Sequence, residues 1–310
     1  MADQSITLDA FLAKHDLPQS YRESANTFFL PLARTIVEWG ANHEGAQFIG
    51  INGAQGTGKS TLADFFKEVL AAEFGKRCAV LSIDDFYLTK TERERLAVSV
   101  HPLLKTRGVP GTHDIALANR VLHDLKTLKK GERYSLPRFD KSVDDRAPVE
   151  TWESVDGPVD IVFLEGWCVG SVASDNESLD APMNALEQTE DSDGVWRQYV
   201  NERLAGPYAA LFAQLDRLCF LKAPNFDAIV RWRTEQEHKL RQRTGAAGVA
   251  VMSDQEILRF IQHYERITVA NLEDLPRRAD VMITLGTDHR AMAMEYRRSS
   301  EPLAPHLERR

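Results

Sequence analysis

One turn restricts the possible folds of this chain more than any other segment. The octapeptide GAQGTGKS, residues 53–60, follows the apolar run Phe48–Ile51 and precedes Thr61 and an apolar helical stretch. This order of strand, glycine-rich turn and helix is typical of a phosphate-binding P-loop. A chance match in an ordinary strand–helix turn is the alternative, but such a turn would not need this flanking context. We therefore expect the chain to bind a nucleoside triphosphate.

Each residue type in the turn has a chemical reason to be there. Glycines let backbone N–H groups converge on phosphate oxygens, and the N-terminus of the following helix adds a partial positive charge. Lys59 can reach the β- and γ-phosphates, and the hydroxyl of Ser60 can ligate Mg²⁺. The residues expected to contact the nucleotide are Gly53, Ala54, Gln55, Gly56, Thr57, Gly58, Lys59, Ser60 and Thr61.

The net charge of −8 is unevenly distributed. Residues 171–195 carry seven acids and no Lys or Arg, so the rest of the chain is close to −1. Because a basic face is missing from this pattern, we expect no nucleic-acid partner. The acidic insert itself is interpreted as a solvated, flexible excursion, with partner binding as the alternative. Its acids are Asp175, Glu177, Asp180, Glu187, Glu190, Asp191 and Asp193.

Cysteine usage and hydropathy indicate a cytoplasmic protein. Cys78, Cys168 and Cys219 are widely spaced in apolar contexts, which favours reduced core thiols over disulfides or a metal site. No segment approaches the 18 consecutive apolar residues of a membrane span. The N-terminus lacks the charged and then apolar pattern of a secretory signal. We expect no membrane association, and the sequence leaves the oligomeric state open.

Short apolar runs that alternate with helical stretches predict a doubly wound parallel sheet. We expect an α/β fold of the P-loop NTPase type, with a helical lid at about residues 228–265, within one domain over residues 45–290. Residues 1–44 are expected to pack on it as a helical segment, through Leu8, Phe11, Leu12 and Leu17, and residues 291–310 to form a tail. The predicted strands are Phe48–Ile51, Ala79–Ile83, Ile161–Leu164, Arg217–Leu221 and Val281–Thr284.

Two of these strands end in acidic residues. Ligands of open α/β sheets bind beyond the carboxyl ends of the strands, so these acids are expected to face the phosphates. Asp84 can take the proton of an attacking hydroxyl or hold Mg²⁺ through water. For Asp85 the alternative is that it caps the next segment. Glu165 ends a Walker-B-like strand and is the expected second contact to Mg²⁺ beside Ser60.

Cations gather in two loops between these strands. The stretches 102–114 and 137–142 hold Lys105, Arg107, His113, Arg138 and Lys141. So many cations suit a small anionic acceptor, since arginine can hold a carboxylate in a bidentate fork. The alternative is a solvated loop with local ion pairs.

A charged helix near residues 231–243 allows two interpretations. The i,i+4 pairs Arg233–Glu237, Glu235–Lys239 and Glu237–Arg241 are typical of a solvated helix face. Alternatively, Arg231 or Arg233 belongs to a lid and neutralises charge on the transferred phosphoryl group.

Several segments together resemble a known group of enzymes. They are GAQGTGKST at 53–61, LSIDDFYLT at 81–89, HPLLKTRGVPGTHD at 101–114, PRFDKS at 137–142, FLEGWCVG at 163–170 and MSDQEILRFIQHY at 252–264. The chain resembles the P-loop kinases that include uridine kinase, phosphoribulokinase and pantothenate kinase, and more closely the D-glycerate 3-kinase family. The resemblance implies ATP and Mg²⁺ as cofactors, with Lys59 and Ser60 on the nucleotide and metal.

The resemblance also suggests roles around the acceptor. It places the base on Asp84, and it places Arg107, Gly108, His113 and Asp114 near the acceptor. We add Asp85, Tyr87, Lys105 and Arg138 to the expected substrate-binding residues, and Arg231 and Arg233 to the catalytic ones.

The expected reaction is transfer of the γ-phosphoryl group of ATP to a hydroxyl of a small organic acid such as D-glycerate. A nucleoside or pantothenate kinase is the alternative within this class, and an ATPase or nucleotide-binding regulatory module is the alternative outside it. A regulatory GTPase is excluded because no Asn-Lys-x-Asp segment occurs.

Overall fold

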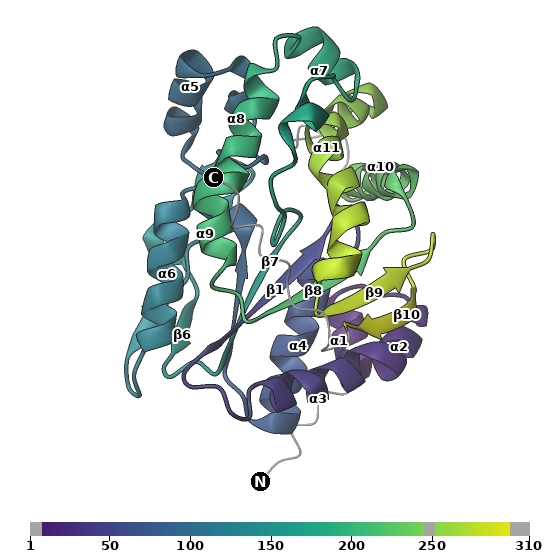
Figure 1. Cartoon of the computed structure of the whole chain (residues 1–310). Coiled ribbons are helices and arrows are strands. Elements are labelled where there is room, and N and C mark those ends of the chain that lie inside the picture. The colour runs from purple at the N-terminus through teal and green to yellow at the C-terminus, as the bar shows by residue number, and fades with distance from the viewer. Residues whose placement is uncertain (1–7, 245–251, 298–310) are drawn as a thin grey trace.

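A six-stranded sheet runs through the centre of the molecule (Figure 1). The computed structural model describes residues 8–244 and 252–297, without the side chains of 239–244. The strand order is β10-β9-β8-β1-β7-β2, and all neighbours except the antiparallel β10 are parallel. The strands are β1 (Gln47–Gly53), β2 (Cys78–Ser82), β7 (Ile161–Gly166), β8 (Arg217–Lys222), β9 (Val281–Leu285) and β10 (Ala291–Tyr296).

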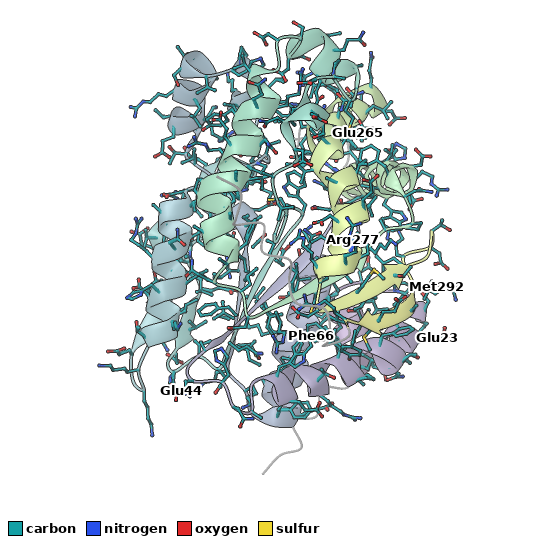
Figure 2. All side chains as sticks on the ribbon, viewed as in Figure 1. Glu23, Glu44, Phe66, Glu265, Arg277 and Met292 are labelled. Carbon is teal, nitrogen blue, oxygen red and sulfur yellow. The ribbon has the colours of Figure 1, made fainter. Side chains whose placement is uncertain are left out.

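Helices cover both faces of this sheet, which confirms the doubly wound architecture. The central strands are fully buried, so each face needs its own apolar cover. One core lies under α6 (Ile115–Thr127), α8 (Val195–Arg203), α9 (Ala209–Phe212) and α11 (Asp254–Arg278). The other lies under α1 (Leu8–Lys14), α2 (Ser20–Ser24), α3 (Leu30–Trp39), α4 (Lys59–Phe74) and α10 (Phe226–Thr244). Figure 2 shows Phe66 inside the second core and Glu23 and Glu44 at the surface.

The predicted strands all occur, and the differences lie at the ends of the chain and in two helices. β10 pairs with β9, so the sheet extends past residue 290, where we had expected a tail to begin. One π-helical turn lies between α2 and α3 and another between α8 and α9, and the second contains Pro207. Phe11 and Leu12 are buried, and Phe11 packs edge-on against Phe65 of α4, so the N-terminal segment does lie on the core. The three cysteines are buried and free.

The acidic insert is not the flexible excursion that its composition suggested. It contains a 3₁₀ turn (Asn176–Leu179) and the helix α7 (Ala185–Glu190), which contribute Leu179 and Leu186 to the interior. Glu187 is 1% exposed and pairs with Arg266 of α11 at 2.5 Å. Glu187 therefore serves as a buried partner for an arginine that lies 79 residues away in the chain.

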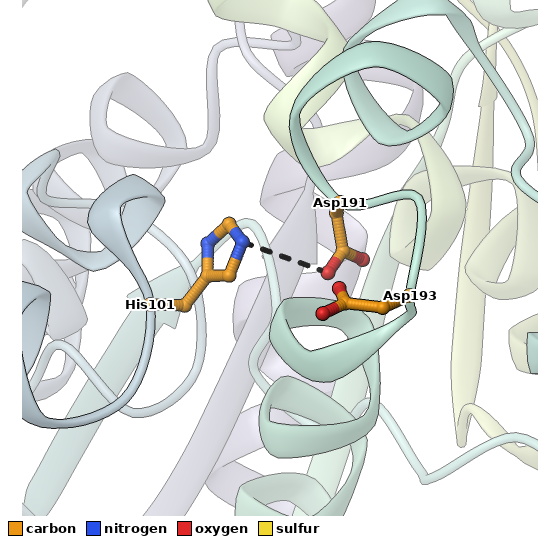
Figure 3. A group of neighbouring side chains, drawn as sticks. All are labelled: His101, Asp191 and Asp193. Atoms are coloured by element: carbon orange, nitrogen blue, oxygen red, sulfur yellow. Dashed lines mark ion pairs between the residues drawn. The ribbon is translucent and has the colours of Figure 1, made fainter.

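One group of the insert also meets the loop that precedes Arg107. The Nε2 atom of His101 lies 3.8 Å from Oδ1 of Asp191, with Asp193 beside them (Figure 3). These are metal-ligand types, but Asp191 already accepts the backbone N–H of Trp196 and pairs with Arg197 at 3.0 Å. The Nδ1 atom of His101 accepts the backbone N–H of Leu103. Asp191 and Nδ1 of His101 thus already have partners within the fold, and the cluster joins the two loops.

None of the helices within the described ranges has the length and apolar character needed to cross a lipid bilayer.

Candidate active site

The P-loop connects the centre of the sheet to helix α4. β1 ends at Gly53 and α4 begins at Lys59. The buried hydroxyl of Thr57 donates to the carbonyl of Ala54 at 2.8 Å and holds the turn from inside. Among the described residues, no hydrogen bond or ion pair engages the side chain of Lys59. Its ammonium group is therefore available to a phosphate.

Gly56 lies between helix α10 and the turn that joins β9 to β10. Its φ is +82°, and a Cβ atom there would lie 2.8 Å from Cβ of Trp232 in α10. Its carbonyl accepts a hydrogen bond from Nδ1 of His289, in the β9–β10 turn, at 3.0 Å. The rings of Trp232 and His289 stack at 4.4 Å. Because a side chain at Gly56 would clash with Trp232, only glycine fits this position.

Ser60 and Glu165 meet at the edge of the site. β7 pairs in parallel with β1, which places Glu165 opposite Ile51 in the register. The Ser60 hydroxyl donates to Oε1 of Glu165 at 2.7 Å. Oε2 is buried and has no partner among the described residues, and the residue is only 3% exposed. An unpaired buried carboxylate oxygen is costly without a cation, so this pair fits Mg²⁺.

Asp84 occupies the corresponding position at the end of β2, in a short 3₁₀ turn (Ile83–Phe86). Its Oδ1 accepts the Tyr87 hydroxyl at 2.7 Å, and its Oδ2 accepts Nζ of Lys141 at 2.6 Å. Burial alone would raise the pKa of Asp84, but the charges of Lys141 and Lys59 and the Tyr87 hydrogen bond lower it to about 2. The side chain remains 28% exposed, so a ligand can reach it.

A small hairpin supplies partners for the acids of the site. β4 (Phe139–Asp140) and β5 (Asp145–Arg146) pair in an antiparallel manner, and Lys141 lies in the turn between them. The ion pairs of this hairpin are Lys141–Asp84 at 2.6 Å, Arg138–Asp85 at 3.2 Å, Arg146–Asp114 at 3.2 Å, Asp144–Arg93 at 3.0 Å and Asp144–Arg107. The loop cations predicted from the sequence are thus largely balanced by acids when no ligand is bound.

His113 is brought to the site, but as a neutral group. Its ring stacks on Tyr87 at 4.6 Å, and it is 4% exposed. Burial lowers the pKa of His113 to about 4, so the expectation that it adds positive charge is wrong. The Tyr208 hydroxyl accepts the N–H of Gly111 and lies 2.5 Å from Nδ1 of His113, to which it can donate its proton. That arrangement leaves the histidine proton on Nε2, which is buried and has no partner in the described residues.

Arg107 and Gly108 join the acceptor loop to the segment that follows β7. The guanidinium of Arg107 lies over the Phe139 ring at 5.5 Å and pairs with Asp144. The Gly108 carbonyl accepts the indole N–H of Trp167 at 3.0 Å. A Cβ atom at Gly108, whose φ is +140°, would lie 2.1 Å from the hydroxyl of Tyr264 in α11. Glycine is therefore required at position 108, where the loop 102–114 meets the segment 163–170.

Three expected substrate-binding residues have structural partners instead. Asp85 caps the turn at Ser82 and accepts from Arg138 and the backbone N–H of Phe139. Asp114 caps α6 through the N–H of Leu117. The carboxylate contacts of both residues are therefore accounted for within the fold, as is the guanidinium of Arg138, which lies between Asp85 and Glu153. Lys105 is exposed, and no described residue contacts its ammonium group.

The two candidate lid arginines differ in their surroundings. Arg233 pairs with the buried Glu237 at 2.7 Å and lies over the ring of Phe260, so it is held inside the pair of helices. Arg231 is exposed and has no hydrogen bond or ion pair within the described part of the chain. Arg231 is thus the freer of the two. The side chains of Lys239 and Arg241, and so their proposed pairs, lie outside the described residues.

Local sequence patterns did not predict Tyr208, Tyr264 or the contact between His289 and Gly56. Their partners are 95, 157 and 233 residues away in the chain. A local pattern does not encode pairs that are so far apart in the chain.

Comparison with known proteins agrees with this geometry. Residues 48–180 match the phosphoribulokinase/uridine kinase family. An uncharacterised kinase of Schizosaccharomyces pombe is 36% identical over 232 residues, covering 71% of this chain and 79% of that protein. The chloroplastic D-glycerate 3-kinase of Arabidopsis thaliana is 33% identical over 223 residues, covering 70% of this chain and 45% of that longer protein.

A solved structure gives a similar result for the fold. The D-glycerate 3-kinase of Cryptococcus neoformans superimposes with a TM-score of 0.73 at 25% identity, covering 87% of this chain and 99% of that one. The similarity therefore extends well beyond residues 48–180, the segment that the family match covers.

Proposed function

The chain belongs to the phosphoribulokinase/uridine kinase family, and we propose that this ATP-dependent small-molecule kinase phosphorylates a hydroxyl of a small organic acid, D-glycerate. The observation that carries the proposal is the position of Asp84. A carboxylate at the end of β2 lies at the same edge of the sheet as the Ser60–Glu165 pair, and it is influenced by the charge of Lys59. A hydrolytic ATPase can use such a carboxylate to orient water, but it has no need of Asp84 together with the cationic loop at residues 102–114.

Ser60 and Glu165 are the residues that we assign to Mg²⁺. The hydroxyl oxygen and the unpaired Oε2 are hard oxygen donors, as this cation prefers. When bound, Mg²⁺ would neutralise charge on the β- and γ-phosphates. Lys59 would add a second positive charge to the same oxygens, since no described residue forms a hydrogen bond or ion pair with its ammonium group.

The transfer itself requires positioning and one proton movement. The acceptor oxygen forms a bond to the γ-phosphorus while the bond from that phosphorus to the bridging oxygen breaks. Asp84 accepts the proton of the acceptor hydroxyl, after Lys141 has left its Oδ2 atom. Tyr87 keeps Oδ1 oriented through its hydrogen bond. Such catalysis depends mainly on orientation and electrostatic stabilisation.

Two features near Asp84 support an acidic acceptor. Arg107 is held by Asp144 and Lys141 by Asp84, so a ligand carboxylate can replace either acid as the partner of the cation. The Nε2–H group of His113 is a buried donor without an acceptor, and a ligand hydroxyl or carboxylate oxygen would satisfy it. A nucleoside acceptor would instead call for a pair of aromatic rings with room for a base between them. Tyr87 and His113 are already stacked on each other.

The names of two similar proteins, both D-glycerate 3-kinases, support the specific acceptor. We also propose a cytoplasmic enzyme that binds neither nucleic acid nor membrane, although one of these relatives is chloroplastic.

An acceptor screen tests the proposal. The purified protein is incubated with ATP, Mg²⁺ and one compound at a time: D-glycerate, L-glycerate, glycerol, uridine or pantothenate. ADP release and the phosphorylated product are both measured. We expect D-glycerate to give product at the highest kcat/KM. Product from uridine or pantothenate alone would assign the enzyme to another acceptor class, and ADP release without any product would favour an ATPase.

A further inference from the structure

Two aromatic side chains hold consecutive carbonyl groups of the acceptor loop, residues 102–114. The indole N–H of Trp167 donates to the Gly108 carbonyl at 3.0 Å, and the hydroxyl of Tyr264 donates to the Arg107 carbonyl at 3.3 Å. The two rings pack edge to face, with their centroids 4.8 Å apart. Both side chains are buried, so water does not compete for these hydrogen bonds. We call Trp167 and Tyr264 the aromatic clamp.

The Trp167 half of the clamp is tied to the strand that leads into the P-loop. Trp167 directly follows β7 and lies two positions after Glu165. Its backbone carbonyl accepts the side-chain amide of Asn52 at 3.2 Å, and the same amide donates to the carbonyl of Val169 at 2.7 Å. Asn52 is buried and directly precedes Gly53, where the P-loop begins. The strands that carry the P-loop and Glu165 therefore also set the position of the indole.

Helix α11 holds the other half of the clamp. Tyr264 lies among the buried residues of this helix, and Asn271 of the same helix reaches the segment after β7. The amide of Asn271 donates to the carbonyl of Trp167 at 3.3 Å and accepts the hydroxyl of Ser171 at 2.9 Å. Since Asn271 and Ser171 are both buried, these bonds are also shielded from water. The acceptor loop, α11 and the segment after β7 thus form one hydrogen-bonded unit.

The clamp fixes the backbone at the residue that we assign to the acceptor carboxylate. The two carbonyl groups that it holds belong to Arg107 and to the next residue, Gly108. They therefore determine the point from which the Arg107 side chain extends. A displacement of about 1 Å in a group that positions a substrate can cost about 10²-fold in rate.

We propose that Trp167 and Tyr264 are positioning residues for the acceptor, which hold the backbone at Arg107 in a fixed place relative to the P-loop and Glu165. The inference rests on the proposed function for the assignment of Arg107. Both side chains act through the backbone of the loop. Their loss should therefore affect use of the acceptor and leave nucleotide binding to the P-loop.

Three conservative variants provide a matched test. Trp167→Phe and Tyr264→Phe each remove one hydrogen-bond donor of the clamp and keep an aromatic ring. Trp196→Phe is the control, because Trp196 is buried in the same core, but its indole N–H has no hydrogen-bond partner among the described residues. Thermal melting first establishes which variants are folded. Tyr264→Phe, which loses a single oxygen atom, decides the question if Trp167→Phe does not fold.

Two measurements follow. Hydrogen–deuterium exchange of residues 102–114, without any substrate, reports on how firmly the loop is held. Steady-state kinetics with ATP, Mg²⁺ and D-glycerate reports on use of the acceptor, and calorimetric titration with ATP reports on the P-loop. The clamp variants should exchange faster in the loop and lose at least about tenfold in kcat/KM for D-glycerate, with unchanged ATP affinity. Trp196→Phe should change none of these quantities.

The same measurements can overturn the proposal. Unchanged exchange in the clamp variants would show that these bonds do not hold the loop. Faster exchange with undiminished kcat/KM would show that the held loop does not position the acceptor. An equal loss of ATP affinity would place the effect on the whole fold. If the wild type phosphorylated no D-glycerate, the proposed function would fail, whereas exchange measured without substrate would still decide whether the clamp holds the loop.

Discussion

Lys141 and Asp84 form a 2.6 Å ion pair across the entrance to the proposed acceptor site. The pair occupies the carboxylate oxygen that is not already bonded to Tyr87, so in this state the acceptor hydroxyl has no free atom of Asp84 to approach. The Lys141 side chain is 57% exposed and lies in a hairpin turn, which allows it to move. An anionic ligand that attracts Lys141 would release the base at the moment when the acceptor arrives.

Asp84→Asn tests whether this carboxylate accepts the proton. The amide keeps the shape of the side chain but cannot take up a proton, so kcat should fall by about 10²–10⁴, the usual effect of losing a general base. ATP affinity, measured by titration, should change little. A matching loss of ATP affinity would make Asp84 a metal-site residue, and an unchanged kcat would remove it from the mechanism.

Lys141→Ala should make the free energy of unfolding less dependent on pH in the acidic range. The pKa of Asp84 is lowered from 3.8 to about 2 in the folded protein, so its ion pair stabilises the fold above the unfolded pKa. That contribution is lost as the pH falls from about 4 toward 2. We expect wild type to exceed Lys141→Ala in unfolding free energy near neutral pH, and the difference to shrink through this range. Urea unfolding at several pH values measures it. Lys105→Ala, which removes an exposed lysine without a partner among the described residues, should show no such trend.

Lys59→Ala should abolish phosphoryl transfer and leave the fold intact. The ammonium group has no partner in the described part of the structure, so its removal costs no native ion pair, whereas a bound triphosphate loses a cation on its β- and γ-oxygens. Thermal melting without nucleotide should match wild type. If phosphoryl transfer also stayed near the wild-type rate, the P-loop assignment would lose its main chemical claim.

Replacing two glutamates of the acidic insert should change the free energy of unfolding by different amounts. Glu187 forms a buried ion pair with Arg266, so Glu187→Ala should lower the unfolding free energy by about 3 kcal/mol. Glu190 forms an exposed pair with Arg259, and Glu190→Ala should cost about 1 kcal/mol or less. Urea unfolding compares the two variants. Equal small losses would show that the insert contributes little to the fold.

The local features of this molecule could be predicted from its sequence, because each depends on a short run of consecutive residues. The P-loop, the five strands and the acids Asp84 and Glu165 each follow from a short pattern. The insert was misjudged for a physical reason. Composition shows seven acids without nearby cations, but Arg266 and Arg259, which pair with Glu187 and Glu190, lie on a helix that is about 70–80 residues away in the chain.

Charge in the site was misjudged in a similar way. The sequence shows Arg138 and His113 as cations near the acceptor, but the fold pairs Arg138 with Asp85 and buries His113 in a setting that keeps it neutral. Partners across tertiary contacts and the loss of solvent both depend on packing. A residue type alone therefore does not determine its charge state in the site.

Arg107 gives the sharpest test of an acidic acceptor. If its guanidinium exchanges Asp144 for the carboxylate of the ligand, Arg107→Ala should raise KM for D-glycerate at least about tenfold, or about 1.4 kcal/mol. Acceptor-free ATP hydrolysis should be nearly unchanged. Arg107→Lys should restore binding only in part, because an ammonium group cannot reproduce the bidentate fork.

Arg133→Ala provides a control for Arg107, since it removes an arginine whose pair with Asp156 is exposed on both sides, and it should leave KM unchanged. Glycerol, which lacks the carboxylate, should be a poor acceptor for wild type and lose little more in Arg107→Ala. If glycerol were as good an acceptor as glycerate, or if both lost equally in the variant, Arg107 would not recognise a carboxylate. The acidic acceptor would then be wrong, while the kinase activity of the P-loop and Asp84 would be unaffected.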